Sequence, residues 1–209
     1  MKDLERRSYT FEIRAEDTDS GAILTGRPIV YNSRTDIGPF DEIIEAGALD
    51  GTDLTDVRFL VNHNTSMIPL ARSRRNNGNS TMKLTPDQFG LNMDFVKLDT
   101  QNNADAAALR SAVERGDITG MSFAFSVDGE EWTELESDHP TRHITRIGSV
   151  VEVSAVTWPA YDATEIYARS KAALDNARSA LDKARQQNAE PLDSGELELM
   201  KEKIKTLWR

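Results

Sequence analysis

The stretch ERGDITGMSFAF, residues 114–125, joins two sequence patterns. Its first residues end a helical pattern that begins after Asn103, a suitable N-cap, and Gly116 stands where a left-handed C-terminal residue is common. Its last residues alternate as a strand does, with bulky apolar side chains on one face and Ser122 on the other. The stretch therefore predicts a helix that leads directly into a strand, with a small polar side chain on one sheet face.

Strand patterns lie on both sides of this helix. Alternating or continuous apolar segments that are bounded by Gly, Pro, Asn and Asp indicate strands. Such segments occur at residues 8–15, 21–32, 40–49, 56–64 and 81–98 before the helix, and at residues 120–127, 130–136, 142–148 and 149–160 after it. Many strands around one inserted helix predict an α+β or barrel-like domain over about residues 8–168.

The character of the sequence changes after Pro159. Residues 170–190 are rich in Ala, Lys and Arg and carry only a weak apolar stripe. Residues 196–209 form a second amphipathic pattern, whose apolar positions are Leu197, Met200, Ile204 and Leu207. Neither segment carries enough apolar surface to fold alone, so we expect a helical tail that docks on another surface or stays mobile.

The composition excludes several classes of function. The 209 residues are 38% hydrophobic, which suffices for one core, and the net charge of −10 argues against a phosphate-binding surface. The absence of cysteine excludes disulfides, thiolate metal sites and cysteine nucleophiles. No apolar run approaches the ~20 residues of a membrane span, and the charged N-terminal residues lack the core of a signal peptide. We therefore expect a soluble cytosolic protein that uses no cofactor, metal, nucleic acid or membrane.

Three residues of the kinds that serine hydrolases use lie in strand-like surroundings. His63 ends the apolar segment VRFLVNHN and continues its inward alternation, and Ser122 lies on a strand face with room for another group to approach. Glu152 is a carboxylate within the apolar segment SVVEVSAV, where it needs a partner to stay charged. A serine nucleophile needs a base, and the base works better when a third group fixes its tautomer. From the residues alone, a purely structural role for each of the three is the alternative.

The other two histidines do not fit a metal pair. His139 and His143 are four residues apart in a strand-like segment that contains Pro140. Four residues along a strand span ~13 Å, which is too far for one metal ion. We predict that both are surface residues. The sequence also lacks Gly-x-Ser-x-Gly, Gly-x-Gly-x-x-Gly and His-Glu-x-x-His motifs.

The chain resembles the tailed-bacteriophage prohead, or capsid maturation, serine proteases. The resemblance covers roughly residues 9–168 and is carried by segments in the order of that family: GAILTGRPIVYN, FDEIIEAGALD, VRFLVNHNTSMIPLARS, FGLNMDFVKLDT, ADAAALRSAVERGDITGMSFAF and EVSAVTWPAYDAT. By position, the family's histidine matches His63, its serine matches Ser122, and its acidic third member falls on Glu152. The related herpesvirus capsid assembly proteases use a second histidine as third member, so His139 and His143 remain alternatives.

The resemblance implies a fold and a role. The fold is a small, mostly antiparallel β-barrel flanked by helices over residues 1–168, with residues 169–209 as a helical tail that docks or is removed by self-cleavage. The role is an endopeptidase that cleaves scaffolding protein, or a scaffold-like extension of the major capsid protein, and itself. It would act inside the immature phage head in the host cytoplasm. The alternative is an inactive protease fold that binds capsid-assembly partners through its C-terminal helices, and either form is compatible with a homo-oligomer.

Overall fold

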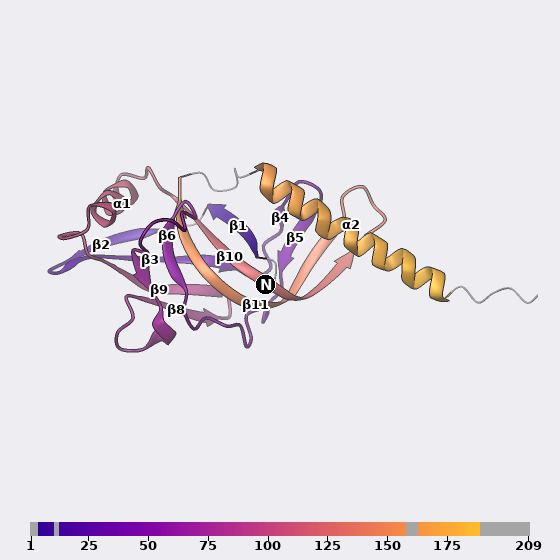
Figure 1. Cartoon of the computed structure of the whole chain (residues 1–209), viewed down its shortest axis with the longest axis horizontal. Coiled ribbons are helices and arrows are strands. Elements are labelled where there is room, and N and C mark those ends of the chain that lie inside the picture. The colour runs from indigo at the N-terminus through magenta and orange to yellow at the C-terminus, as the bar shows by residue number, and fades with distance from the viewer. Residues whose placement is uncertain (1–3, 11–12, 158–162, 189–209) are drawn as a thin grey trace, which may run out of the picture.

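The structure is a computed structural model and describes residues 4–10, 13–157 and 163–188 of the chain (Figure 1). These residues form a mixed α+β fold in which strands predominate, as the sequence predicts. The described helices are α1 (Ala104–Glu114), α2 (Ala163–Asn188) and a short 3-10 helix, η1 (Arg74–Asn76). Within the described residues, no helix has both the length and the apolar character that crossing a membrane requires.

The larger sheet has seven strands. Their order is β1-β10-β11-β5-β4, and β6 pairs with both β11 and β7. Most pairs are antiparallel, but β5 and β6 run parallel to β11, each along a different part of it. The strands of this sheet are β1 (Glu5–Thr10), β4 (Thr35–Asp36), β5 (Asp41–Ile44), β6 (Arg58–Val61), β7 (Ala71–Arg72), β10 (Gly120–Thr133) and β11 (Thr141–Val156).

The smaller sheet has four antiparallel strands in the order β2-β3-β9-β8. Its strands are β2 (Arg14–Thr18), β3 (Gly21–Val30), β8 (Met82–Asp87) and β9 (Gly90–Leu98). Residues 81–98, which carry a strand pattern in the sequence, form the hairpin of β8 and β9. Gln88 and Phe89 make the turn between these two strands.

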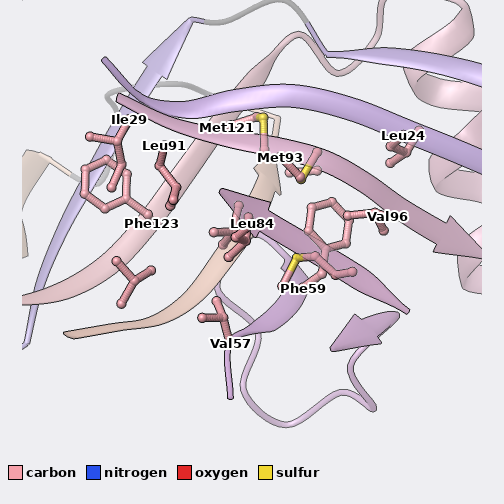
Figure 2. Packing of buried hydrophobic residues seen from close by; sticks show 14 of the residues in the cluster. Leu24, Ile29, Val57, Phe59, Leu84, Leu91, Met93, Val96, Met121 and Phe123 are labelled. Atoms are coloured by element: carbon pink, nitrogen blue, oxygen red, sulfur yellow. The ribbon is translucent and has the colours of Figure 1, made fainter. Parts of the chain in front are cut away.

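Both sheets contribute side chains to one hydrophobic core (Figure 2). Phe59 and Phe123 come from the larger sheet, Leu84 and Met93 come from the smaller one, and all four are almost fully buried. Burying a side chain of this kind contributes roughly 1.5–3 kcal/mol. The core thus holds β6 and β10 in place, and these strands lead to His63 and carry Ser122.

The predicted closed barrel is not confirmed. In the described part of the chain, strand pairing stops at β1, β4 and β7 in the larger sheet and at β2 and β8 in the smaller one. A barrel requires a continuous ladder of hydrogen bonds around its circumference, and among the described residues no strand pairing links the two sheets. The longest pairing is instead the hairpin of β10 and β11, whose register shifts at four places.

The predicted helix before β10 is confirmed at both of its ends. Asn103 is the N-cap of α1, and its side-chain oxygen accepts hydrogen bonds from the backbone N–H groups of Asp105 at 3.0 Å and Ala106 at 3.2 Å. Gly116 follows the helix with a φ of 75°. This left-handed conformation costs glycine little, so the chain turns out of α1 toward β10.

Only part of the expected helical tail falls within the described residues. The helix α2 crosses the predicted boundary at residue 168, and Leu174 of this helix is buried. The guanidinium of Arg178 donates hydrogen bonds to the carbonyl oxygens of Leu135 at 3.1 Å and Ser137 at 2.8 Å. These contacts connect α2 to the loop between β10 and β11. The second amphipathic pattern, residues 196–209, lies outside the described residues.

Candidate active site

Ser122 is the third residue of β10 and lies between two neighbouring strands. It is directly opposite Ser8 of β1 and Ser154 of β11. Residues that face each other in antiparallel strands project their side chains to the same side of the sheet. The three serines therefore form a row across the sheet, and both Ser122 and Ser154 are fully buried.

His63 lies next to this row because of a turn. The sequence predicted instead that His63 continues the alternation of a strand. Strand β6 ends at Val61, and Asn62 and His63 follow with φ values of 50° and 55°. Left-handed backbone is uncommon outside glycine, but asparagine and histidine adopt it more readily than most residues. The Asn62 N–H donates to the carbonyl oxygen of Ala155 at 2.9 Å, and its side-chain oxygen accepts from the N–H of Thr157 at 3.0 Å. These bonds fix the turn against the end of β11.

The structure brings the three predicted site residues into direct contact. Nε2 of His63 lies 2.6 Å from Oγ of Ser122, and Nδ1 of His63 makes a short contact with Oε1 of Glu152. The serine therefore touches one ring nitrogen and the carboxylate touches the other. This is the order of contacts in which a base removes a proton from a nucleophile while a third group orients the base.

Ser154 links the members of this group. Its hydroxyl donates to Oε2 of Glu152 at 2.6 Å and accepts a hydrogen bond from the backbone N–H of His63 at 3.2 Å. The two oxygens of Glu152 thus have separate partners, which stabilises a carboxylate away from water. The side chains of His63 and Glu152 are both only 7% exposed.

The two alternative histidines lie at other sites. His143 places Nδ1 2.6 Å from Oε1 of Glu45, and His139 places Nε2 3.2 Å from Oδ1 of Asp41. These contacts lie apart from His63, whose Nδ1 contacts Glu152.

His139 also belongs to a small surface cluster of potential metal ligands. Asp36, Asp41 and His139 each offer one ligand atom, and these three atoms lie within 4.8 Å of one another. The guanidinium of Arg34 lies 3.3 Å from the second oxygen of Asp41, so a positively charged side chain already neutralises part of this cluster.

Sequence reasoning gave no role to three residues that complete the surroundings of Ser122. The hydroxyl of Ser8 donates to Oγ of Ser122 at 2.8 Å, and Oγ of Ser122 donates to the carbonyl oxygen of Arg7 at 2.7 Å. Ser154 could have been found, because it lies two residues after Glu152 and so on the same strand face. Nothing in the local sequence connects Arg7 and Ser8 with a strand that begins more than 100 residues later.

Comparison with protein families adds an independent observation to this geometry. Residues 9–178 match the model of a family described as caudovirus prohead serine protease. The chain belongs to this prohead protease family. Searches of curated proteins and of solved structures found no match to the chain. The resemblance inferred from the ordered sequence segments is therefore confirmed at the level of the family.

Family membership gives the chain a general role. The family is one of phage serine proteases, and membership implies a place in the immature capsid within the host cell and a capsid-related substrate. The matched range includes His63, Ser122 and Glu152. It begins at residue 9, so Arg7 and Ser8 lie before it.

Proposed function

We propose that this prohead protease family member is a serine endopeptidase with Ser122 as nucleophile, His63 as general base and Glu152 as the group that orients His63. The observation that supports this proposal is the chain of contacts from Oγ of Ser122 through both nitrogens of His63 to Glu152. The proposed substrate is a scaffolding protein or a scaffold-like extension of the major capsid protein, and the enzyme also trims itself.

The proposed reaction has two halves. Oγ of Ser122 attacks the carbonyl carbon of the scissile peptide bond while Nε2 of His63 takes the hydroxyl proton. When the C–N bond breaks, His63 returns this proton to the leaving amine and an acyl group remains on Ser122. Water then attacks the acyl group with His63 again as base, which releases the new carboxyl terminus and restores the serine. Glu152 stabilises the cationic form of His63 in both halves.

A serine substitution with a matched control tests the proposal. Ser122→Ala removes the nucleophile, and Ser126→Ala removes another buried serine of β10, whose hydroxyl lies 3.0 Å from that of Ser149. We expect Ser122→Ala to abolish labelling by a fluorophosphonate and to slow proteolysis on the order of 10⁶-fold. Ser126→Ala should keep both activities.

Processing of the natural substrate gives the second readout. Each variant is co-expressed with the capsid and scaffolding proteins of the same phage, and intact masses are measured. Full-length substrate with Ser122→Ala, and trimmed substrate with Ser126→Ala, are expected. Normal trimming in the presence of Ser122→Ala would remove Ser122 from the mechanism.

A further inference from the structure

The proposed nucleophile is covered by the first strand of the chain. Strand β1 lies at the edge of the larger sheet and pairs with β10 from Glu5 opposite Phe125 to Thr10 opposite Gly120 (Figure 1). This pairing crosses Ser122, whose exposed fraction is 0%. A substrate cannot contact Oγ while β1 holds this position, so catalysis requires a neighbouring element to move.

The hydrogen bonds of Ser122 identify β1 as that element. Apart from His63, the polar contacts that the described residues make with Oγ come from β1, namely the carbonyl oxygen of Arg7 and the hydroxyl of Ser8. A serine hydroxyl has one proton, and both the carbonyl oxygen of Arg7 and Nε2 of His63 lie within hydrogen-bond distance of Oγ. His63 can act as a base only when that proton points to Nε2. Strand β1 therefore competes with His63 for the serine proton.

Strand β1 also has the shape of a bound peptide. An extended peptide commonly binds a protein by adding a strand to a sheet edge, with main-chain hydrogen bonds for affinity and side-chain pockets for specificity. The carbonyl of Arg7 is the peptide carbonyl in hydrogen-bond contact with Oγ. In a substrate strand that binds in the same register, one residue takes the position of Arg7 and the next takes the position of Ser8. The peptide bond between these two residues would face Ser122.

The side chain of Arg7 occupies a buried acidic pocket. Its guanidinium forms a two-pronged pair with Glu42 of β5, with Nε to Oε1 and Nη2 to Oε2 both at 2.6 Å. The side chains are 4% and 0% exposed. Burial alone would lower the pKa of Arg7, but the charge and hydrogen bonds of Glu42 raise it above the usual value. The pocket therefore favours a fixed positive charge.

Glu42 keeps a second cation nearby when Arg7 is removed. Nη1 of Arg142 lies 3.1 Å from Oε2 of Glu42, so the carboxylate is not left without any partner. The pocket can thus exchange one basic side chain for another at a lower cost than a lone buried carboxylate would require.

We propose that β1 occupies the position of the substrate strand within the same chain, and that the substrate pairs with β10 once β1 leaves. In this position the substrate places a basic residue in the Glu42 pocket, on the amino-terminal side of the cleaved bond. Glu42 is then a specificity-determining residue. This inference rests on the proposed protease function, and Arg7 and Ser8 lie outside the range that the family shares.

A reversible cross-link tests whether β1 must leave. The chain has no cysteine, and Arg6 of β1 lies directly opposite Ala124 of β10, so Arg6→Cys/Ala124→Cys allows a disulfide between these strands alone. The labelling rate of Ser122 by a fluorophosphonate follows the fraction of molecules in which β1 has left. We expect oxidation to lower this rate by about tenfold or more and reduction to restore it. The two single-cysteine variants should respond to neither treatment.

The outcomes separate the two proposals. Equal labelling of the oxidised and reduced protein would overturn the inference and leave the protease function standing. No labelling of Ser122 in either state, together with an intact capsid substrate, would overturn the protease function itself and the inference with it.

Peptide cleavage tests the specificity separately. A library of random decapeptides is incubated with the wild-type protein, and the cleaved bonds are identified by mass spectrometry. We expect Arg and Lys to be enriched about tenfold or more at the residue before the cleaved bond. A tenfold preference corresponds to the free energy of one buried hydrogen bond to a charged group. Glu42→Gln should reduce this enrichment, and Glu45→Gln, which changes a half-exposed carboxylate next to β5, should not. Cleavage by the wild-type protein without a basic preference would overturn the inference even if Glu42→Gln failed to fold.

Discussion

Replacing Glu152 with glutamine tests the orienting group by exchanging one oxygen for NH₂. The position of Ser154 decides how the new amide turns. Its hydroxyl accepts from the N–H of His63 at 3.2 Å and donates its own proton to Oε2 of residue 152 at 2.6 Å. In Glu152→Gln the amide oxygen therefore stays toward Ser154, and the NH₂ group faces Nδ1 of His63.

This orientation forces the wrong tautomer on the histidine. An amide NH₂ only donates, so Nδ1 of His63 must accept and the ring proton moves to Nε2. Nε2 lies 2.6 Å from Oγ of Ser122 and would then carry a proton where it must take one. We expect Ser122 acylation to slow by about 10⁴-fold, the loss that an inverted tautomer causes in serine protease triads. The near-identical shape of the side chain should preserve the fold.

Adding Ser154→Ala should partly rescue this variant. Without the Ser154 hydroxyl, the amide of Glu152→Gln can turn its oxygen toward Nδ1 of His63 and restore the productive tautomer. The double variant then lacks mainly the negative charge, which corresponds to a loss of about 10–10². Ser154→Ala alone is the matched control and should cost less than Glu152→Gln alone.

The assay is the second-order rate of fluorophosphonate labelling at Ser122, together with trimming of the co-expressed capsid protein. The reasoning would be refuted by a Glu152→Gln protein that reacts at the wild-type rate. It would also be refuted by a double variant no faster than Glu152→Gln, because the orientation imposed by Ser154 is the stated cause of the larger loss.

Two further predictions concern stability. In Gly90→Ala the new Cβ would lie 2.0 Å from the carbonyl oxygen of Ile29 at a φ of 141°, so urea unfolding should show a loss of roughly 3 kcal/mol or more. Gly51→Ala is the control, because the φ of Gly51 is also positive but a Cβ there would meet no atom within 4 Å. The expected loss in the free energy of unfolding is ~1 kcal/mol for this variant. Equal losses for the two variants would contradict the clash at Gly90. Burial raises the pKa of Glu5, but Arg142 and Arg7 outweigh this and hold it below the ordinary 4.5. Its stabilising effect is therefore present above pH 4.5 and is lost as the pH falls through the lowered pKa. The Tm difference between wild type and Glu5→Gln should accordingly shrink on acidification, and a constant difference would count against this ion pair.

Features that depend on neighbouring residues could be predicted from the sequence. The cap at Asn103 forms hydrogen bonds with residues two and three positions later, and Gly116 satisfies a local backbone requirement. Strand alternation correctly placed Ser122 on one face of β10, and the same two-residue period puts Glu152 and Ser154 on a common face of β11. These patterns repeat within a few residues, so a single chain segment contains the information that they need.

The position of His63 at the site could not be predicted from local sequence patterns. Strand alternation placed it on an inward face, but β6 ends two residues earlier and a left-handed turn directs the ring toward Ser122. The bonds that fix the turn come from the end of β11, about 90 residues further along the chain. The expected barrel failed for a related reason, since closure depends on strand edges that are distant in sequence.

The sequence by itself determined the residue types, the helix ends, the strand faces and, through its ordered segments, the family. The tertiary structure decided which faces meet: Ser122 with His63, His63 with Glu152, and β1 over the proposed nucleophile. The physical reason is the distance along the sequence over which each interaction acts. Alternation and capping act over a few residues, whereas the contact between Ser122 and Arg7 joins positions 115 residues apart and exists only when the whole sheet has formed.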